Sequence, residues 1–447
     1  MIVMYRISAT LLIVSALILA CESGVRGDET AGGGDSLGVM SIADPLEASS
    51  YADTLDAAVD GGTVLLPGVR QKILIEEDSL WAEALRVHYN AIVLDGHIDT
   101  PSLMVDEAYV LGNRNRALAG HVDLPRMFDG GLDAAFFAIY VPVSLGESAS
   151  AVRRARRMID EVERQVAALS DSMGMAYSAD DVRLLTRSGR KAVLLGLEGG
   201  HALMASPDTL QALYDEGVRY VTLTHVNSHS WAESSQSPPR FGGLNDLGRR
   251  LLRKMNEIGM IVDLSHVSDS TFYDALQVSN APVMLSHSSA RALVDNVRNV
   301  DDEMLLALAE NGGIIMINFF DPVVNSALSD SFMDAVYKRL GGRSGNLNTI
   351  WNVIYEMKAE QGLPGASLED VVDHIDHAVQ VAGVDHVGLG SDFDGVFDLP
   401  AGLQDVTRLP WITYKLMKRG FSEEDLYKIL GGNALRVMEE VESAATR

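Results

Sequence analysis

The sequence predicts an α/β protein that folds as a (β/α)8 barrel, the TIM barrel architecture. From Ile92 onward, short apolar runs rich in β-branched residues alternate with longer amphipathic segments, which is the pattern of a parallel sheet covered by helices. Eight such runs occur along the chain, and eight parallel strands indicate a closed barrel rather than an open sheet.

The expected strands are short and separated by long connections. They cover residues 92–99, 133–143, 191–198, 218–225, 259–266, 282–287, 313–319 and 386–392. Between them, apolar residues at helical spacing predict helices, for example at residues 151–169, 247–257 and 368–382.

The connection after the seventh expected strand is long for a barrel loop. We therefore expect a helical insertion around residues 321–367, with helices at residues 331–340 and 347–361. Its place near the mouth of the barrel suits a lid or a contact between subunits.

The N-terminal segment has the features of an export signal. Arg6 precedes the apolar stretch LLIVSALILA, which is too short for a stable membrane-spanning helix and ends directly before Cys21. The sequence Ile-Leu-Ala-Cys resembles the bacterial lipobox, in which the cysteine becomes a lipid-carrying N-terminus. Because Cys21 is the only cysteine in the chain, it has no internal disulfide partner, and its position favours lipidation over a signal that is simply cleaved.

These features divide the chain into three expected parts. Residues 1–21 form a lipoprotein signal peptide, residues 22–50 a flexible tether rich in glycine, serine and acids, and residues 51–447 a single barrel domain. We expect an exported protein that a lipid anchor holds at the periplasmic or extracellular face of a bacterial membrane.

The overall charge narrows the range of partners. Lysine and arginine total 36 against 62 acidic residues, which gives a formal net charge of -26. Such a surface repels polyanions, so nucleic acid is not an expected partner. The acidity is more simply explained by solubility outside the cell.

Side chains of the kind that bind metals stand at the carboxyl ends of six expected strands. Barrel enzymes carry their reactive groups at this end, so these side chains should share one rim. They are His97, Asp99, Glu198, His225, His266, His287 and Asp392.

This recurrence points to a metal centre. A single His-x-Asp pair such as His97 and Asp99 is more often an ordinary strand end, but independent strands here deliver histidine or glutamate to one layer of one barrel. Imidazole and carboxylate ligands suit zinc. Glu198 ends a buried type of strand and needs a cationic partner, which a pair of zinc ions would supply.

The remaining histidines are interpreted as structural. They lie in helical segments, in loops or before a strand, and only His201, which follows Glu198-Gly-Gly, is a candidate for a supporting role beside the metals. The others are His88, His121, His229, His374, His377 and His386.

Eight segments of the chain resemble the signature segments of the membrane dipeptidase (renal dipeptidase) family, the zinc metallopeptidase family M19. They occur in the family's order and span most of the chain from about Asp95 to Val441, which makes the set far more specific than any one member. The segments are LDGHIDTP, GLEGGH, LTHVNSHSW, MNEIGMIVDLSHVS, APVMLSHSSARAL, RNVDDEML, DHVGLGSDFDG and GGNALRVMEEV.

The resemblance implies a barrel of the metal-dependent hydrolase type with two Zn²⁺ ions per chain. It makes His97 and Asp99 the ligands of one zinc, and His266 and His287 the ligands of the other. Glu198 bridges the two ions and so belongs to the catalytic machinery.

The resemblance also assigns residues to the substrate. His225 faces the substrate and stabilises the oxyanion, Arg298 receives the substrate carboxylate, and Asp392 handles the proton. The implied substrates are dipeptides, with a D-residue at the C-terminal position as a possibility, and the implied assembly is a homodimer. Thr100 and the loop of residues 226–235 depart from the family pattern, which leaves the specificity of the pocket open.

Two other functions stay open at this point. One is a different metal-dependent amide hydrolase on the same barrel, such as a cyclic-amide hydrolase or a deaminase. Many of those begin with His-x-His and bridge their metals through a modified lysine, whereas Lys191 begins its strand and is badly placed for that role. The other is a lipid-anchored binding protein that keeps the barrel without catalysis.

Overall fold

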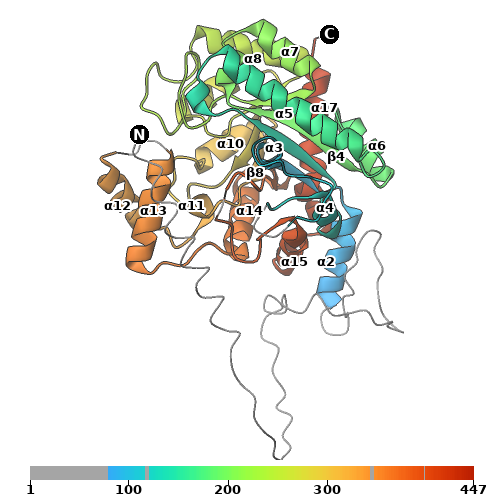
Figure 1. Cartoon of the computed structure of the whole chain (residues 1–447). Helices are drawn as coiled ribbons and strands as arrows, with labels where there is room; N and C mark the ends of the chain where they lie inside the picture. Colours follow the sequence, from blue (N-terminus) through green and yellow to red (C-terminus); the bar gives the residue numbers. More distant parts are fainter. Residues whose placement is uncertain (1–78, 116–119, 343–346, 397, 447) are drawn as a thin grey trace, which may run out of the picture. The chain divides into compact units, whose positions relative to one another are not determined.

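Eight parallel strands close into a barrel in the computed structural model, which describes residues 79–115, 120–342, 347–396 and 398–446 (Figure 1). Each strand pairs with its neighbour in the order β2-β1-β9-β8-β7-β6-β5-β4, and β2 pairs with β4 to close the ring. The expectation of a (β/α)8 barrel is confirmed. The strands are β1 (Leu94–Ile98), β2 (Ala134–Tyr140), β4 (Lys191–Glu198), β5 (Val218–Thr222), β6 (Ile261–Asp263), β7 (Met284–Ser288), β8 (Ile314–Ile317) and β9 (Val387–Leu389).

A further short strand lies outside the ring. This strand, β3 (Met173–Met175), pairs in parallel with the first residues of β4, whereas β5 pairs with the later residues of β4. The sequence did not predict it, because three residues are too few to show an alternating pattern.

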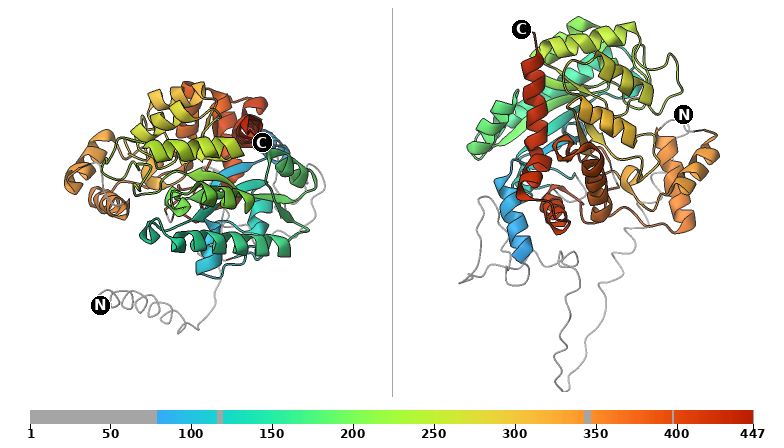
Figure 2. Two further views of the ribbon diagram at one scale, coloured as in Figure 1. Left: turned by 90° about the horizontal axis from the view of Figure 1, so that it is seen from above. Right: turned by 180° about the vertical axis from the view of Figure 1, so that it is seen from behind.

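Helices surround the barrel and connect its strands, as the views in Figure 2 show. Local signals set their ends: α8, for example, begins after Asn245, whose side chain accepts hydrogen bonds from Leu247 and Gly248, and ends at Gly259, whose φ is positive. The helices are α2 (Ser79–Asn90), α3 (Thr100–Asp106), α4 (Leu124–Asp129), α5 (Ala149–Ala168), α6 (Ala179–Arg187), α7 (Pro207–Asp215), α8 (Asp246–Ile258), α9 (Asp269–Val278), α10 (Asp302–Glu310), α14 (Leu368–Ala382), α15 (Leu409–Lys418), α16 (Glu423–Tyr427) and α17 (Asn433–Ala444).

The described residues of the long connection after β8 form three helices. They are α11 (Asp321–Val324), α12 (Asp330–Leu340) and α13 (Leu347–Gln361), and α12 and α13 lie together at one side of the barrel in Figures 1 and 2. A buried ion pair joins the Lys358 ammonium of α13 to Asp321 at the start of α11. This pair ties the insertion to the end of β8, next to the mouth of the barrel.

Apolar side chains fill the interior of the barrel. Phe136, Leu194, Tyr220 and Met316 belong to one buried cluster, which also contains residues from the starts of several strands and from α17. Helix α17 therefore covers the amino end of the barrel, and the opposite end is left for the site. Gly196 makes room for Tyr220, since a Cβ at this glycine would lie 2.0 Å from the phenol ring.

Within the described part of the chain, no helix combines the length and the apolar character that crossing a bilayer requires. The expected signal peptide at residues 1–21, with Cys21, and the expected tether at residues 22–50 lie outside the described residues.

Candidate active site

The seven side chains that the sequence placed at strand ends meet at the carboxyl end of the barrel. His97, Glu198 and His287 belong to strands β1, β4 and β7. His225 and His266 lie in loops just beyond β5 and β6, because these strands end at Thr222 and Asp263, earlier than the sequence suggested. The other two members of this set, which follow the ends of β1 and β9, are Asp99 and Asp392.

Glu198 is the centre of the group. Its Oε1 atom lies 3.3 Å from Nε2 of His266, 3.5 Å from Nε2 of His287 and 3.8 Å from Nε2 of His225, and its Oε2 atom lies 3.6 Å from Nε2 of His97. We call these five residues the Glu198 cluster. One carboxylate thus faces four imidazoles at a rim that is almost fully buried.

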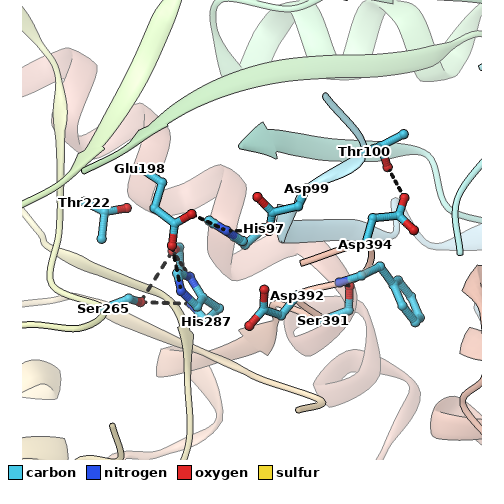
Figure 3. Close-up of polar contacts among 12 residues, drawn as sticks. His97, Asp99, Thr100, Glu198, Thr222, Ser265, His287, Ser391, Asp392 and Asp394 are labelled. Carbon is cyan, nitrogen blue, oxygen red and sulfur yellow. Dashed lines mark hydrogen bonds and ion pairs between the residues drawn. The ribbon is translucent and has the colours of Figure 1, made fainter. Parts of the chain in front are cut away.

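Two more carboxylates complete the rim on the β1 side. Nε2 of His97 lies 3.3 Å from Oδ2 of Asp99, and Asp392 offers a carboxylate oxygen within 4.8 Å of both residues. In Figure 3 the side chains of His97, Asp99, Glu198 and Asp392 point toward one shared region. The group has the composition and the convergence of a metal site.

The hydrogen bonding of the imidazoles fits bound metal. Nε2 of His97 is buried and has no hydrogen-bond partner among the described residues, although it faces two carboxylates. Nε2 of His266 and Nε2 of His287 lie only 2.9 Å apart. The imidazole nitrogens and carboxylate oxygens that converge here have lone pairs to offer a metal ion. Zinc prefers ligand atoms of this kind.

Protein groups hold the far side of the imidazoles. Nδ1 of His97 lies 2.7 Å from the phenol oxygen of Tyr220, inside the barrel. Nδ1 of His287 lies 2.8 Å from the hydroxyl of Ser286, which donates a hydrogen bond of 2.7 Å to Asp263. Such contacts fix the orientation of a ring and leave its other nitrogen for the site.

The electrostatics agree with this arrangement. Burial alone would raise the pKa of Glu198, but the neighbouring imidazoles, above all that of His97, hold this pKa well below its usual value. Burial lowers the pKa of His266 and of His287 well below the usual range. Glu198 is therefore a carboxylate at neutral pH, and these two rings are neutral and carry free lone pairs.

A cavity of about 290 Å³ opens over the cluster. Glu198, His225 and Asp392 line it together with Arg298, which is 6 % exposed. Burial lowers the pKa of Arg298 to about 10, so the guanidinium stays cationic at neutral pH. Its Nη2 donates to the carbonyl oxygen of His287 at 3.0 Å, whereas its Nη1 is buried and finds no partner in the described part of the chain.

The side chain of Asp392 is held by a neighbouring amide, and its backbone has an unusual conformation. Nδ2 of Asn318 donates to its Oδ2 at 3.0 Å, and burial raises its pKa. Its φ is 65°, and those of His266 and Asp394 are 69° and 68°, in the left-handed region that residues other than glycine rarely adopt. Backbone strain of this kind is typical of functional sites.

Asp394 is a site residue that the sequence did not single out. It lines the same cavity and accepts a hydrogen bond of 2.5 Å from the hydroxyl of Thr100 (Figure 3). It accepts another from the backbone of His121. Thr100, one of the two departures from the family pattern, thus supports the loop that carries Asp392. Two acids two residues apart in the segment SDFDG are the only sequence signal for this role.

The histidines interpreted as structural make other contacts. His88, His374 and His386 bond to backbone or hydroxyl groups away from the rim, and His377 pairs with Asp302. His121 contacts Asp394, with its Nδ1 3.3 Å from Oδ1 of that residue. His201 and His229 line a separate cavity and are not among the described groups that could hold a metal.

A parallel barrel whose carboxyl end gathers imidazoles around a buried carboxylate is typical of the class of metal-dependent hydrolases.

Residues 81–447 match the model of the membrane dipeptidase family, peptidase family M19. Two curated fungal relatives support the match. Dipeptidase tcpJ from Claviceps purpurea is 40% identical over 366 residues, 78% of this chain and 77% of that protein, and dipeptidase aclJ from Aspergillus oryzae is 38% identical over 336 residues, 73% and 72% of the two chains.

Solved structures agree with this assignment. The probable dipeptidase PvdM from Pseudomonas aeruginosa is 26% identical with a TM-score of 0.72, over 82% of this chain and 99% of that one. A metallopeptidase from Rhodobacter sphaeroides, liganded with a phosphinate mimic of the dipeptide L-Ala-D-Ala, is 27% identical with a TM-score of 0.65, over 78% and 99%. The chain belongs to the membrane dipeptidase family, and its activity is that of a metal-dependent dipeptidase.

Proposed function

We propose that this chain is a zinc-dependent dipeptidase that hydrolyses the one peptide bond of a dipeptide. The observation that carries the proposal is that Glu198, His225 and His266 of the cluster line one cavity of about 290 Å³ together with the buried cation of Arg298. Such a cavity suits a small ligand in which an amide and a free carboxylate lie a short distance apart.

The donor set supports two metal sites that share Glu198. His97 and Asp99 would hold one zinc ion, and His266 and His287 would hold the other. When bound, the ions supply Lewis acidity to the attacking water and to the scissile carbonyl.

The chain's own residues then bind the substrate and move its protons. Asp392 takes the proton of the attacking water and passes it to the departing amine, and the raised pKa of its carboxyl suits both steps. Burial lowers the pKa of His225 to about 4, so its ring is neutral and donates a hydrogen bond to the developing oxyanion.

Arg298 would set which peptide bond is cleaved. Among the described residues its Nη1 has no partner and is available to a carboxylate in the cavity, and a guanidinium binds a terminal carboxylate with two parallel hydrogen bonds. A carboxylate held at this point would direct the adjoining peptide bond toward Glu198 and His266, which line the same cavity. This favours a dipeptidase over a hydrolase of cyclic amides that carry no carboxylate beside the amide.

The relatives support one refinement of the substrate. The ligand of the Rhodobacter sphaeroides enzyme mimics a dipeptide with a D-residue at its C-terminal end. We include dipeptides of this configuration among the substrates of this chain.

Two features of the whole protein belong to the proposal. Lipidation at Cys21 would anchor the enzyme at the outer side of a bacterial membrane, with residues 51–447 as its catalytic domain. Resemblance to the family favours a homodimer, which the mass of the purified protein in light scattering would test.

The test measures hydrolysis before and after removal of metal. The purified full chain should contain about two zinc ions, cleave Ala-Ala, lose this activity after chelation and regain it with added zinc. The C-terminal amide of Ala-Ala is the matched control and should remain intact, because it lacks the carboxylate that Arg298 would bind. Alanine tripeptide should also remain intact, because its additional N-terminal residue would have to fit beyond the cluster in a cavity of about 290 Å³. Full activity in metal-free protein, or equal cleavage of the amide, would contradict the proposal.

A further inference from the structure

The cavity over the Glu198 cluster is lined by two unlike sets of residues. The charged and polar set includes Glu198, His225 and His266 together with Arg298, Asn318 and Asp392. The apolar set consists of Phe320, Val323, Trp351 and Val396, which we call the apolar wall. A wall of this kind in a cavity built for polar chemistry suits a side chain of the substrate.

The apolar wall adjoins Arg298. The loop that carries Arg298 is joined to helix α11 by two side-chain amides: Asn296 donates to the carbonyl oxygen of Pro322 at 3.0 Å, and Asn299 donates to that of Val323 at 2.9 Å. Arg298 is therefore fixed beside Val323 and the start of α11. A ligand group held by Arg298 lies within one residue's reach of the apolar wall.

The wall is firmly held in place. Trp351 is 6% exposed and packs edge to face on Phe320, with ring centroids 4.7 Å apart and an interplanar angle of 89°. Helix α13, which carries Trp351, is tied to α11 by the buried pair of Lys358 and Asp321. The aromatic surface is thus part of the built cavity: Phe320 lies just before α11, and Trp351 comes from the insertion.

We propose that the apolar wall is the subsite for the side chain of the C-terminal residue, and that Trp351 makes the enzyme select large apolar or aromatic side chains there. The inference rests on the proposed function. The carboxylate that Arg298 binds and the side chain of the same residue are attached to one Cα atom, so binding the first places the second against the wall. A charged side chain would lose its water at Phe320 and Trp351 and gain no partner.

Gly-Phe, Gly-Leu, Gly-Asp and Gly-Gly test this selection, each chiral dipeptide in both configurations. For the wild-type protein we expect kcat/KM for Gly-Phe and Gly-Leu to exceed that for Gly-Gly by roughly ten- to a hundredfold, with Gly-Asp the poorest substrate. Using both configurations separates a preference for size from a preference for stereochemistry.

Two variants on helix α13 locate the effect. Trp351→Ala should lower kcat/KM for Gly-Phe at least tenfold and leave that for Gly-Gly within about twofold, and Trp351→Phe should restore most of the preference. Asn352→Ala, an exposed neighbour on the same helix, is the matched control and should keep the wild-type preference.

Product inhibition of the wild-type protein gives a readout that does not depend on a folded variant. Free phenylalanine carries the carboxylate and the side chain of the C-terminal residue, so it should inhibit Gly-Gly hydrolysis at a concentration at least tenfold lower than glycine does. Equal inhibition by both amino acids, or an equal loss of Gly-Phe and Gly-Gly hydrolysis in Trp351→Ala, overturns the inference. Failure of the proposed function is distinct, because no dipeptide would then be hydrolysed.

Discussion

At the residue scale, the site depends on side chains that never face the substrate. Tyr220 contacts His97 from within the barrel, and the hydroxyl of Ser286 joins His287 to the buried carboxylate of Asp263. Each contact points one ring nitrogen toward Glu198 without help from a metal. The Glu198 cluster is thus arranged by the protein, and metal binding needs little rearrangement.

Tyr220→Phe tests this arrangement. The variant removes the phenol oxygen that holds Nδ1 of His97 but keeps the buried ring, so we expect zinc affinity to fall roughly tenfold to a hundredfold. The free energy of unfolding of the metal-free protein should fall by only about 1 kcal/mol. Competition with a chelating dye measures the affinity, and thermal unfolding measures the stability.

Tyr89→Phe is the control for this variant. It removes a phenol hydrogen bond to the carbonyl oxygen of Asp129, away from the Glu198 cluster, and should leave zinc affinity unchanged. An unaltered affinity in Tyr220→Phe would show that His97 needs no support from the barrel interior.

At the element scale, local patterns predicted the helices better than the strand ends. The expected helices at residues 347–361 and 368–382 match α13 and α14 at both ends, because spacing and the cap at Ser367 are local signals. The strands expected to reach His225 and His266 stop earlier, since the positive φ of His266 cannot continue a strand. The sequence suggested which side chains share the rim, but not their support by Tyr220, which depends on contacts between distant strands.

Lys358→Met tests how the insertion is held. The Lys358 ammonium and the Asp321 carboxylate are both buried, and removal of one partner leaves an uncompensated charge, so we expect the free energy of unfolding to fall by about 3 kcal/mol. The preference for Gly-Phe over Gly-Gly should weaken as α13 loosens. Denaturant unfolding and the two kcat/KM values measure these effects.

Lys338→Met on helix α12 is the matched control, because Lys338 is exposed. It should change stability by less than about 0.5 kcal/mol and leave the preference intact. Equal stability of the two variants would mean that the pair of Lys358 and Asp321 does not hold the insertion.

At the scale of the whole molecule, the net charge and the proposed lipid anchor suggest where the enzyme works. The net charge of -26 opposes binding to polyanions, and a lipid at Cys21 would keep the barrel close to a membrane on the tether of residues 22–50. Small dipeptides diffuse freely to such a site, whereas large anionic polymers are repelled.

Cys21→Ala tests the anchor in cells of a bacterial host. The full chain should sediment with membranes and carry a lipid on its first residue after processing, and the variant should appear in the soluble fraction with unchanged kcat/KM for dipeptides. Cell fractionation and mass spectrometry of the N-terminal peptide measure the two outcomes. Membrane association that survives the substitution would rule out lipidation as the anchor.

The close contact between Gly196 and the ring of Tyr220 limits which amino-acid substitutions homologous chains can accept at these two positions. Because a methyl group at residue 196 would overlap the phenol, substitutions at residues 196 and 220 depend on each other. A larger residue at 196 becomes acceptable only after the aromatic ring has been lost, and with it the contact to His97. Homologous chains should therefore show glycine at the first position wherever the second is aromatic, a covariation that a family alignment can test.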